Sequence, residues 1–422
     1  MTSRGEEISK EELINLFKKK EYTLFETNAL NYIKKYKDTE VMNLLSEVYI
    51  EKKKFNTAKA LLLEVLEMNK SDINSLLNLG RLYYIANKTH DSKKLYFEVL
   101  RIDPISSNAL LGLVLNYITL KEFEDAIYYL QRKIEIDKVN CENYHLLGDI
   151  YLIIENYDEA SKFYGLSTLD KSKARELECL YVLGEYDKFL LKLNFFIKHD
   201  KYSALVASLS SHFSYKNSLV DNYNFCNKPM DFIYKKNLLE EEICDDNFIK
   251  NILYDFNNTV ISKREQNLLN GGFQSGGNIF DLESKSIRNL EKIIDREINS
   301  YRQKFSNSTN KIITKFPKKY TLSGWIIRIK KGDYLKPHIH EEGWLSGSFY
   351  LNMPRLKKLN QGSIEFSLEG GRLTNEKKIF PTKLVDLKKG DFILFPSSLF
   401  HSTVPIESNE ERITLAFDVR PK

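Results

Sequence analysis

The chain has 422 residues, of which 42% are hydrophobic and 12% aromatic, so it can form two or three domains with large buried cores. Its 63 Lys and Arg residues against 58 Asp and Glu residues leave a net charge of only +5, and no basic block carries interleaved aromatic residues, so we expect no nucleic-acid partner. Four scattered cysteines without a CxxC pair and the lack of a long apolar run argue against a disulfide framework and a membrane span, and favour a cytoplasmic location.

The first half of the chain repeats at steps of 34 residues. Leucines, tyrosines and small residues recur in phase: Leu45, Leu79, Leu113 and Leu147; Tyr49, Tyr83, Tyr117 and Tyr151; Ala58, Ser92, Ala126 and Ala160. A helical hairpin of this size cannot bury its apolar face alone, so neighbouring hairpins stack into a solenoid. The pattern resembles the tetratricopeptide repeat over about residues 38–172, although Val114 replaces the usual glycine. The resemblance implies a concave surface that binds a protein or peptide partner.

The organisation predicted from these patterns has three parts. Residues 1–202 form the helical solenoid, including a degenerate last helix pair, and residues 203–236 form an aromatic, turn-rich connector. Residues 237–422 form the second domain, which begins with helices at Phe248–Phe256 and Ile287–Phe305. Between these helices lies a glycine-rich loop, 270–278, which has no GK[ST] ending and is therefore not a phosphate loop.

From about Tyr320 the pattern changes to short β-branched and aromatic runs separated by turn residues. The expected strands are Trp325–Lys330, Ser348–Leu351, Gly362–Phe366, Lys383–Leu387, Asp391–Phe395 and Arg412–Asp418. Strands at this spacing favour a jelly-roll, or double-stranded β-helix, barrel. The fold class predicted for the whole chain is therefore α+β and multidomain, a helical solenoid followed by a jelly roll with flanking helices. Two lysine pairs, at 357–358 and 377–378, are predicted to lie in solvated loops.

Three of the seven histidines fall in two short segments of this domain. His338 and His340 are two residues apart, so on an extended strand their imidazoles point to the same side. His401 follows an apolar strand and can return to that side on another strand of the barrel. Imidazole suits Fe(II), Zn, Ni and Cu, and three ligands on one face leave open positions of the kind that a non-heme iron oxygenase requires. The three histidines are therefore the predicted metal ligands.

Arg412 indicates which kind of ligand the predicted pocket binds. It lies on the expected last strand, where Arg412 and Thr414 point to the same face. A buried guanidinium near a metal is a suitable anchor for the far carboxylate of a dicarboxylate. The near, 2-oxo acid end would then be free to chelate the metal.

These residues resemble the Fe(II)/2-oxoglutarate-dependent dioxygenase superfamily over about 270–421. More narrowly, Pro337-His338-Ile339-His340 with Trp344–Tyr350, followed by Leu394–His401, is similar to a bacterial and phage family of oxygenases that often carry tetratricopeptide repeats in front. The resemblance implies Fe(II), 2-oxoglutarate as co-substrate and O₂. It makes His338 the first ligand and His401 the distal histidine, and it assigns the C5 carboxylate of 2-oxoglutarate to Arg412, Thr414 and Tyr350.

His340 departs from the superfamily, which usually has Asp or Glu at this position. Three alternatives follow: His340 binds the metal as a third imidazole, Glu341 or Glu342 binds instead, or two histidines bind alone and water completes the site. We favour His340, because it shares the strand face with His338, whereas Glu341 points to the other face of a regular strand.

The function predicted from the sequence is an Fe(II)- and 2-oxoglutarate-dependent dioxygenase that hydroxylates a protein, a peptide or a small molecule, with the repeats recruiting the substrate. Two alternatives stay open. One is a three-histidine, cupin-like dioxygenase that does not use 2-oxoglutarate. The other is a non-catalytic repeat scaffold whose barrel binds metal only for structure or sensing.

Overall fold

The computed structural model describes residues 8–259, 263–264, 267–354, 360–373 and 379–422. The chain divides into two compact units, 1–172 and 173–422. Both lysine pairs predicted to lie in solvated loops fall outside the described residues. Within the described part, no helix is both long and apolar enough to span a bilayer.

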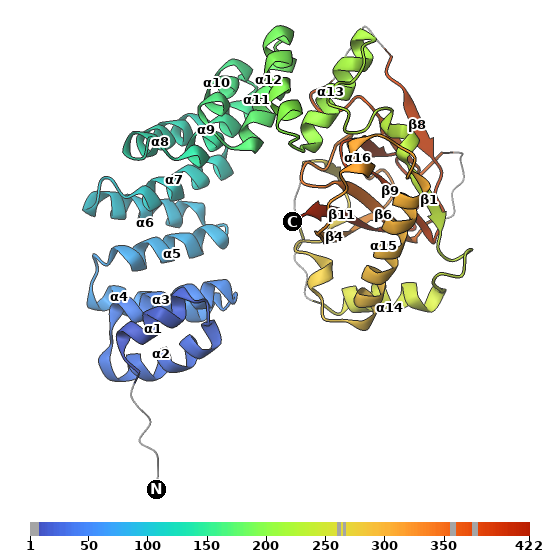
Figure 1. Cartoon of the computed structure of the whole chain (residues 1–422). Helices are drawn as coiled ribbons and strands as arrows, with labels where there is room; N and C mark the ends of the chain where they lie inside the picture. Colours follow the sequence, from blue (N-terminus) through green and yellow to red (C-terminus); the bar gives the residue numbers. More distant parts are fainter. Residues whose placement is uncertain (1–7, 260–262, 265–266, 355–359, 374–378) are drawn as a thin grey trace. The chain divides into compact units, whose positions relative to one another are not determined.

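The first unit consists of paired helices (Figure 1). Its helices are α1 Lys10–Lys18, α2 Tyr22–Tyr36, α3 Thr39–Glu51, α4 Phe55–Met68, α5 Ile73–Ile85, α6 Thr89–Ile102, α7 Ser107–Leu120, α8 Phe123–Ile136, α9 Cys141–Ile153 and α10 Tyr157–Leu166. The predicted period reappears in the backbone, because one residue with positive φ joins the two helices of each pair from α3 to α10: Lys53, Asn87, Lys121 and Glu155. The side chains of Asp38, Asp72 and Asn140 cap the first helices of three pairs.

The small residues of the repeat lie where two helices approach closely, as predicted. A Cβ atom added to Gly80 would come within 3.0 Å of the Tyr96 ring, and one added to Gly148 within 2.6 Å of the Tyr164 ring. Both tyrosines are buried. The glycines therefore allow a large aromatic side chain of the second helix to pack on the backbone of the first.

The second unit begins within α11 and contains more helices than the pattern at 237–422 predicts. They are α11 Asp170–Val182, α12 Tyr186–Lys198, α13 Ala204–Asn217, α14 Asp246–Asn257, α15 Lys285–Lys304 and the short α16 Lys311–Thr314, with 3-10 turns η1 Pro229–Phe232 and η2 Ile279–Asp281. Leu177, Phe196 and Phe225 share one hydrophobic core with the strand residues Phe349 and Phe417. Compactness thus groups α12 and α13 with the sheet, whereas the sequence pattern places α12 in the solenoid (1–202) and α13 in the connector (203–236).

Antiparallel strands form the centre of the second unit. They are β1 Tyr234–Asn237, β2 Leu269–Asn270, β3 Phe273–Gln274, β4 Tyr320–Ile329, β5 Tyr334–Leu335, β6 Leu345–Asn352, β7 Ile364–Ser367, β8 Thr382–Val385, β9 Asp391–Pro396, β10 Phe400–Thr403 and β11 Arg412–Pro421. Six of them form a sheet in the order β1-β9-β6-β11-β4-β3, a second sheet has the order β10-β7-β8, and β2 pairs with β5. The predicted fold class, an all-helical repeat region followed by an antiparallel β domain with flanking helices, is confirmed.

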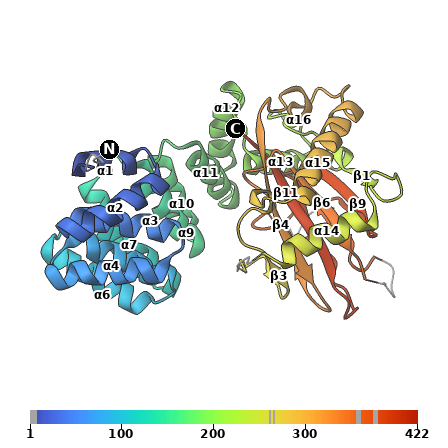
Figure 2. The same cartoon turned by 90° about the horizontal axis from the view of Figure 1, so that it is seen from below.

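The central strands β6 and β11 have two different faces. Leu345, Phe349, Leu415 and Phe417 pack into the core that contains α15, whose ribbon crosses this sheet in Figures 1 and 2. The alternate residues of the same strands line a cavity: Gly347, Ser348, Tyr350, Arg412, Thr414, Ala416 and Asp418. Gly347 is the exception to strict alternation, and its missing side chain leaves room for the Phe417 ring. Because successive side chains of a strand point to opposite faces, the helix-covered face is apolar and the cavity face carries the polar groups.

Candidate metal centre

The three histidines predicted as ligands lie together. His338 and His401 form an isolated antiparallel bridge, in which each backbone N–H donates to the carbonyl oxygen of the other at 3.1 and 3.0 Å. The backbone N–H of His340 donates to Ser397 O at 3.0 Å. The segment of His338 and His340 is therefore extended and paired, although it lies outside the named strands. One ligand atom from each histidine lies within 4.8 Å of those of the other two.

Each of these imidazoles has an acceptor beside its Nδ1 atom. His338 Nδ1 lies 2.7 Å from Lys336 O, and His401 Nδ1 lies 3.2 Å from Leu399 O. A carbonyl oxygen can only accept, so we assign the proton to Nδ1 and the lone pair to Nε2 in both rings. His340 Nε2 and His338 Nε2 are 3.3 Å apart. Two lone pairs that face one another at this distance repel unless a cation binds them, so the geometry favours a metal site.

Burial keeps two of the histidines neutral. It lowers the pKa of His338 to about 4, with a smaller contribution from His340. Burial also holds the pKa of His401 well below its usual range. A neutral imidazole is the form that binds a metal. His338 and His401 are therefore ready to bind a cation at neutral pH without first releasing a proton.

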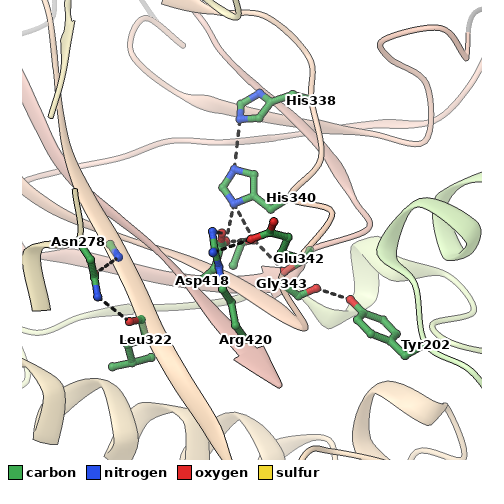
Figure 3. A network of polar contacts seen from close by, with 12 residues as sticks. Tyr202, Asn278, Leu322, His338, His340, Glu342, Gly343, Asp418 and Arg420 are labelled. Carbon is green, nitrogen blue, oxygen red and sulfur yellow. Dashed lines mark hydrogen bonds and ion pairs between the residues drawn. The ribbon is translucent and has the colours of Figure 1, made fainter. Parts of the chain in front are cut away.

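The side chain of His340 is held by a carboxylate that the sequence interpretation missed. Asp418 Oδ1 lies 2.5 Å from His340 Nδ1, and Ser346 Oγ lies 2.8 Å from the same oxygen and 3.0 Å from His340 Nδ1. Figure 3 shows His340 between His338 and Asp418. Asp418 is buried on β11, with Arg412 and Thr414 on the same cavity face. Continuing the alternation that relates Arg412 to Thr414 along the strand would have found it.

Neither glutamate that follows His340 joins the cluster. Glu341 Oε1 lies 2.7 Å from Arg175 Nη2, and Glu342 Oε2 lies 2.6 Å from Arg420 Nη1, a pair visible in Figure 3. Arg175 also binds the buried Glu178 at 2.6 Å, and this ties helix α11 to the segment beside His340. Both glutamates line the cavity, but an arginine engages each of them.

Arg412 is buried in the same cavity, and two of its nitrogens lack a partner within the described part of the chain. Its exposed fraction is 4%, and Nε and Nη1 contact no acceptor there. The Tyr350 hydroxyl is also buried and unpartnered among the described residues, and its ring centroid lies 5.1 Å from the guanidinium carbon. Thr414 pairs with Tyr350 across β11 and β6. The structure thus brings together the three residues predicted to bind a carboxylate.

The cavity that holds both groups has a volume of about 250 Å³. Its wall combines the histidines and Arg412 with apolar side chains, among them Ile327, Ile364 and Phe395. Trp325 also lines it, with its ring centroid 5.5 Å from that of His340. Trp344 packs in the core, where its indole N–H donates to Ile312 O at 2.9 Å.

Comparison with known families agrees with this geometry. Residues 323–418, from β4 to Asp418, match the family described as "Putative 2OG-Fe(II) oxygenase", and residues 39–72 and 142–168 match a tetratricopeptide repeat family. The chain carries a putative 2OG-Fe(II) oxygenase domain preceded by tetratricopeptide repeats. The oxygenase family implies Fe(II) and 2-oxoglutarate, and tetratricopeptide repeats typically mediate protein interactions. No curated protein matches the chain.

Several solved structures are similar to part of this chain. The crystal structure of MamA is 22% identical, with 37% of this chain and 98% of that chain covered and a TM-score of 0.34. A tetratricopeptide repeat protein from Parabacteroides merdae is 16% identical, with coverages of 53% and 88% and a TM-score of 0.39. TTC0263 from Thermus thermophilus is 17% identical, with coverages of 42% and 95% and a TM-score of 0.33. Scores of this size carry no argument about function.

The residues present fit the groups that the oxygenase family implies. Three imidazoles whose ligand nitrogens lie within 4.8 Å of one another suit Fe(II). The unpartnered Arg412 nitrogens and the Tyr350 hydroxyl are buried donors that lack an anion, and one carboxylate of 2-oxoglutarate would satisfy them. Both sets of groups line one cavity, so a single co-substrate molecule can be held at both ends.

Proposed function

We propose that the protein is an Fe(II)- and 2-oxoglutarate-dependent dioxygenase in which His338, His340 and His401 hold the metal. The observation that carries the proposal is a buried Arg412, two of whose nitrogens have no partner among the described residues, in the cavity lined by the three histidines. When bound, Fe(II) supplies the oxidation chemistry, coupling the decarboxylation of 2-oxoglutarate to succinate and CO₂ with oxidation of a second substrate by O₂.

In this proposal the chain holds the co-substrate by its two ends. Arg412, Tyr350 and Thr414 bind the C5 carboxylate, while the histidines leave open metal positions for the oxo acid. The apolar walls exclude water from the charged anchor, which strengthens its hydrogen bonds. Ionisation of Tyr350 is opposed, because burial raises the pKa of its hydroxyl, so Tyr350 remains a donor.

The second substrate would react at the mouth of the cavity. At about 250 Å³ the cavity is small for a ligand site, and the co-substrate would fill much of it. A narrow group, such as a side chain of a protein or peptide, can reach the metal in the space that remains. The repeats are a suitable surface to recruit such a partner, and this part of the proposal rests on the usual role of the repeat.

An anaerobic titration tests the proposal. Fe(II) and then 2-oxoglutarate are added to wild type, to His401→Ala and to a control, His199→Ala, whose histidine directly follows α12 and does not line the cavity. We expect the weak visible charge-transfer band of the chelate in wild type and in the control, and its loss in His401→Ala. Admission of O₂ should then yield succinate. A wild-type protein that binds Fe(II) but forms neither band nor succinate would refute the use of 2-oxoglutarate and favour the three-histidine alternative.

A further inference from the structure

Asp418 is a buried carboxylate whose main partners are groups of the proposed metal centre. Its exposed fraction is 2%. Oδ1 contacts His340 Nδ1 at 2.5 Å and Ser346 Oγ at 2.8 Å, and Ser346 Oγ lies in turn 2.9 Å from Ser397 Oγ. Its Oδ2 atom lies 3.7 Å from Arg420 Nη2. The neighbouring nitrogen of Arg420 is already engaged by Glu342.

A carboxylate in this position needs a positive charge nearby. Burial of an ionised group is costly unless it is paired and hydrogen-bonded, and Arg420 is too distant to be a close hydrogen-bonded partner. A divalent cation on His340 Nε2 would provide that charge through the ring. The carboxylate would in return accept a hydrogen bond from the Nδ1–H group of His340. This hydrogen bond would fix the tautomer of His340 and make its Nε2 atom a stronger electron donor to the metal.

The histidine at position 340, where the superfamily usually has Asp or Glu, indicates what such a carboxylate would do. The related oxygenases usually bind the metal with two histidines and one Asp or Glu, so a third imidazole leaves the site one negative charge short. We propose that Asp418 is a positioning residue that restores this charge from behind His340 and so sets the affinity for Fe(II) and the electron density at the metal. This inference rests on the proposed function, in which the three histidines hold the metal.

The test compares Asp418→Asn with a matched control, Glu342→Gln. Asparagine keeps the shape and one acceptor oxygen but removes the charge, whereas Glu342 pairs with Arg420. Fe(II) is titrated anaerobically against a competing chelator, without 2-oxoglutarate. We expect Asp418→Asn to weaken Fe(II) binding by roughly 10- to 100-fold and the control to leave it unchanged.

A second measurement separates electronic positioning from loss of structure. With 2-oxoglutarate added, iron bound by a less basic His340 is harder to oxidise, so the visible band of Asp418→Asn should move to shorter wavelength. Loosened packing alone would weaken the band without moving it in this direction. Ser346→Ala keeps the carboxylate and removes a hydroxyl that donates to it, so it should weaken Fe(II) binding less than Asp418→Asn. It also provides a measurable variant if Asp418→Asn does not fold.

The outcomes distinguish this inference from the proposed function. If wild type binds Fe(II) and both Asp418→Asn and Ser346→Ala bind it equally well with an unmoved band, Asp418 has no such role, while the proposed function stands. Equal weakening by Glu342→Gln would also overturn the inference, because the effect would then belong to general cavity charge. If wild type binds no Fe(II), both proposals fall together.

Discussion

Replacement of Arg412 by methionine should have opposite effects on co-substrate binding and on stability. Two of its nitrogens are unpartnered, and each charge-assisted hydrogen bond to a carboxylate contributes about 1.5 kcal/mol or more. Loss of both corresponds to about 3 kcal/mol, or a 2-oxoglutarate dissociation constant raised on the order of 100-fold. The free protein should become more stable, by about 1–3 kcal/mol, because methionine removes a buried group with unsatisfied donors.

Calorimetry measures both effects. Anaerobic titration of 2-oxoglutarate into the Mn(II)-loaded protein gives the dissociation constant, and scanning calorimetry of the metal-free protein gives its unfolding temperature. Arg328→Met is the matched control, since Arg328 lies on the neighbouring strand β4, binds Asn257 and lines no part of the cavity. Unchanged 2-oxoglutarate binding in Arg412→Met would refute the anchor. If Arg412→Met destabilised the metal-free protein, the argument that the unpartnered Arg412 nitrogens cost stability would be refuted.

Two further predictions concern other parts of the chain. Burial lowers the pKa of His212 to about 4 from 6.5, so as pH falls from 6.5 to 4 the unfolded chain takes up a proton that the folded chain does not. The folded state should therefore lose about 3 kcal/mol over this window, and His212→Gln should flatten that part of a denaturant-measured stability profile; an unchanged slope would contradict it. In the repeats, a Cβ atom at Gly112 would lie 2.3 Å from the Tyr96 ring, so Gly112→Ala should destabilise the first unit by about 1–3 kcal/mol in thermal melts. The same variant should leave Fe(II) binding unchanged, and a normal melt would contradict the packing argument.

The repeats were predictable from the sequence because their contacts are local and recur. Leucine, tyrosine and small residues in phase indicate helical pairs, since each helix packs on the next one along the chain. The longer strands of the second unit were predictable from their β-branched and aromatic runs and from the turn residues between them. The extent of that unit was not, because nothing local shows that Leu177 and Phe196 share a core with Phe349.

In the candidate site the sequence by itself predicted the side chains that face the cavity. Two histidines at i and i+2, a third after an apolar strand, and Arg412 with Thr414 on one strand face follow from local geometry alone. Only the tertiary structure decided how they are held. Asp418 contacts His340 from strand β11. Arg175 binds Glu341, and Arg420 binds Glu342. These pairings join residues far apart in the chain, and strand register and helix packing, rather than sequence spacing, bring them within hydrogen-bond distance.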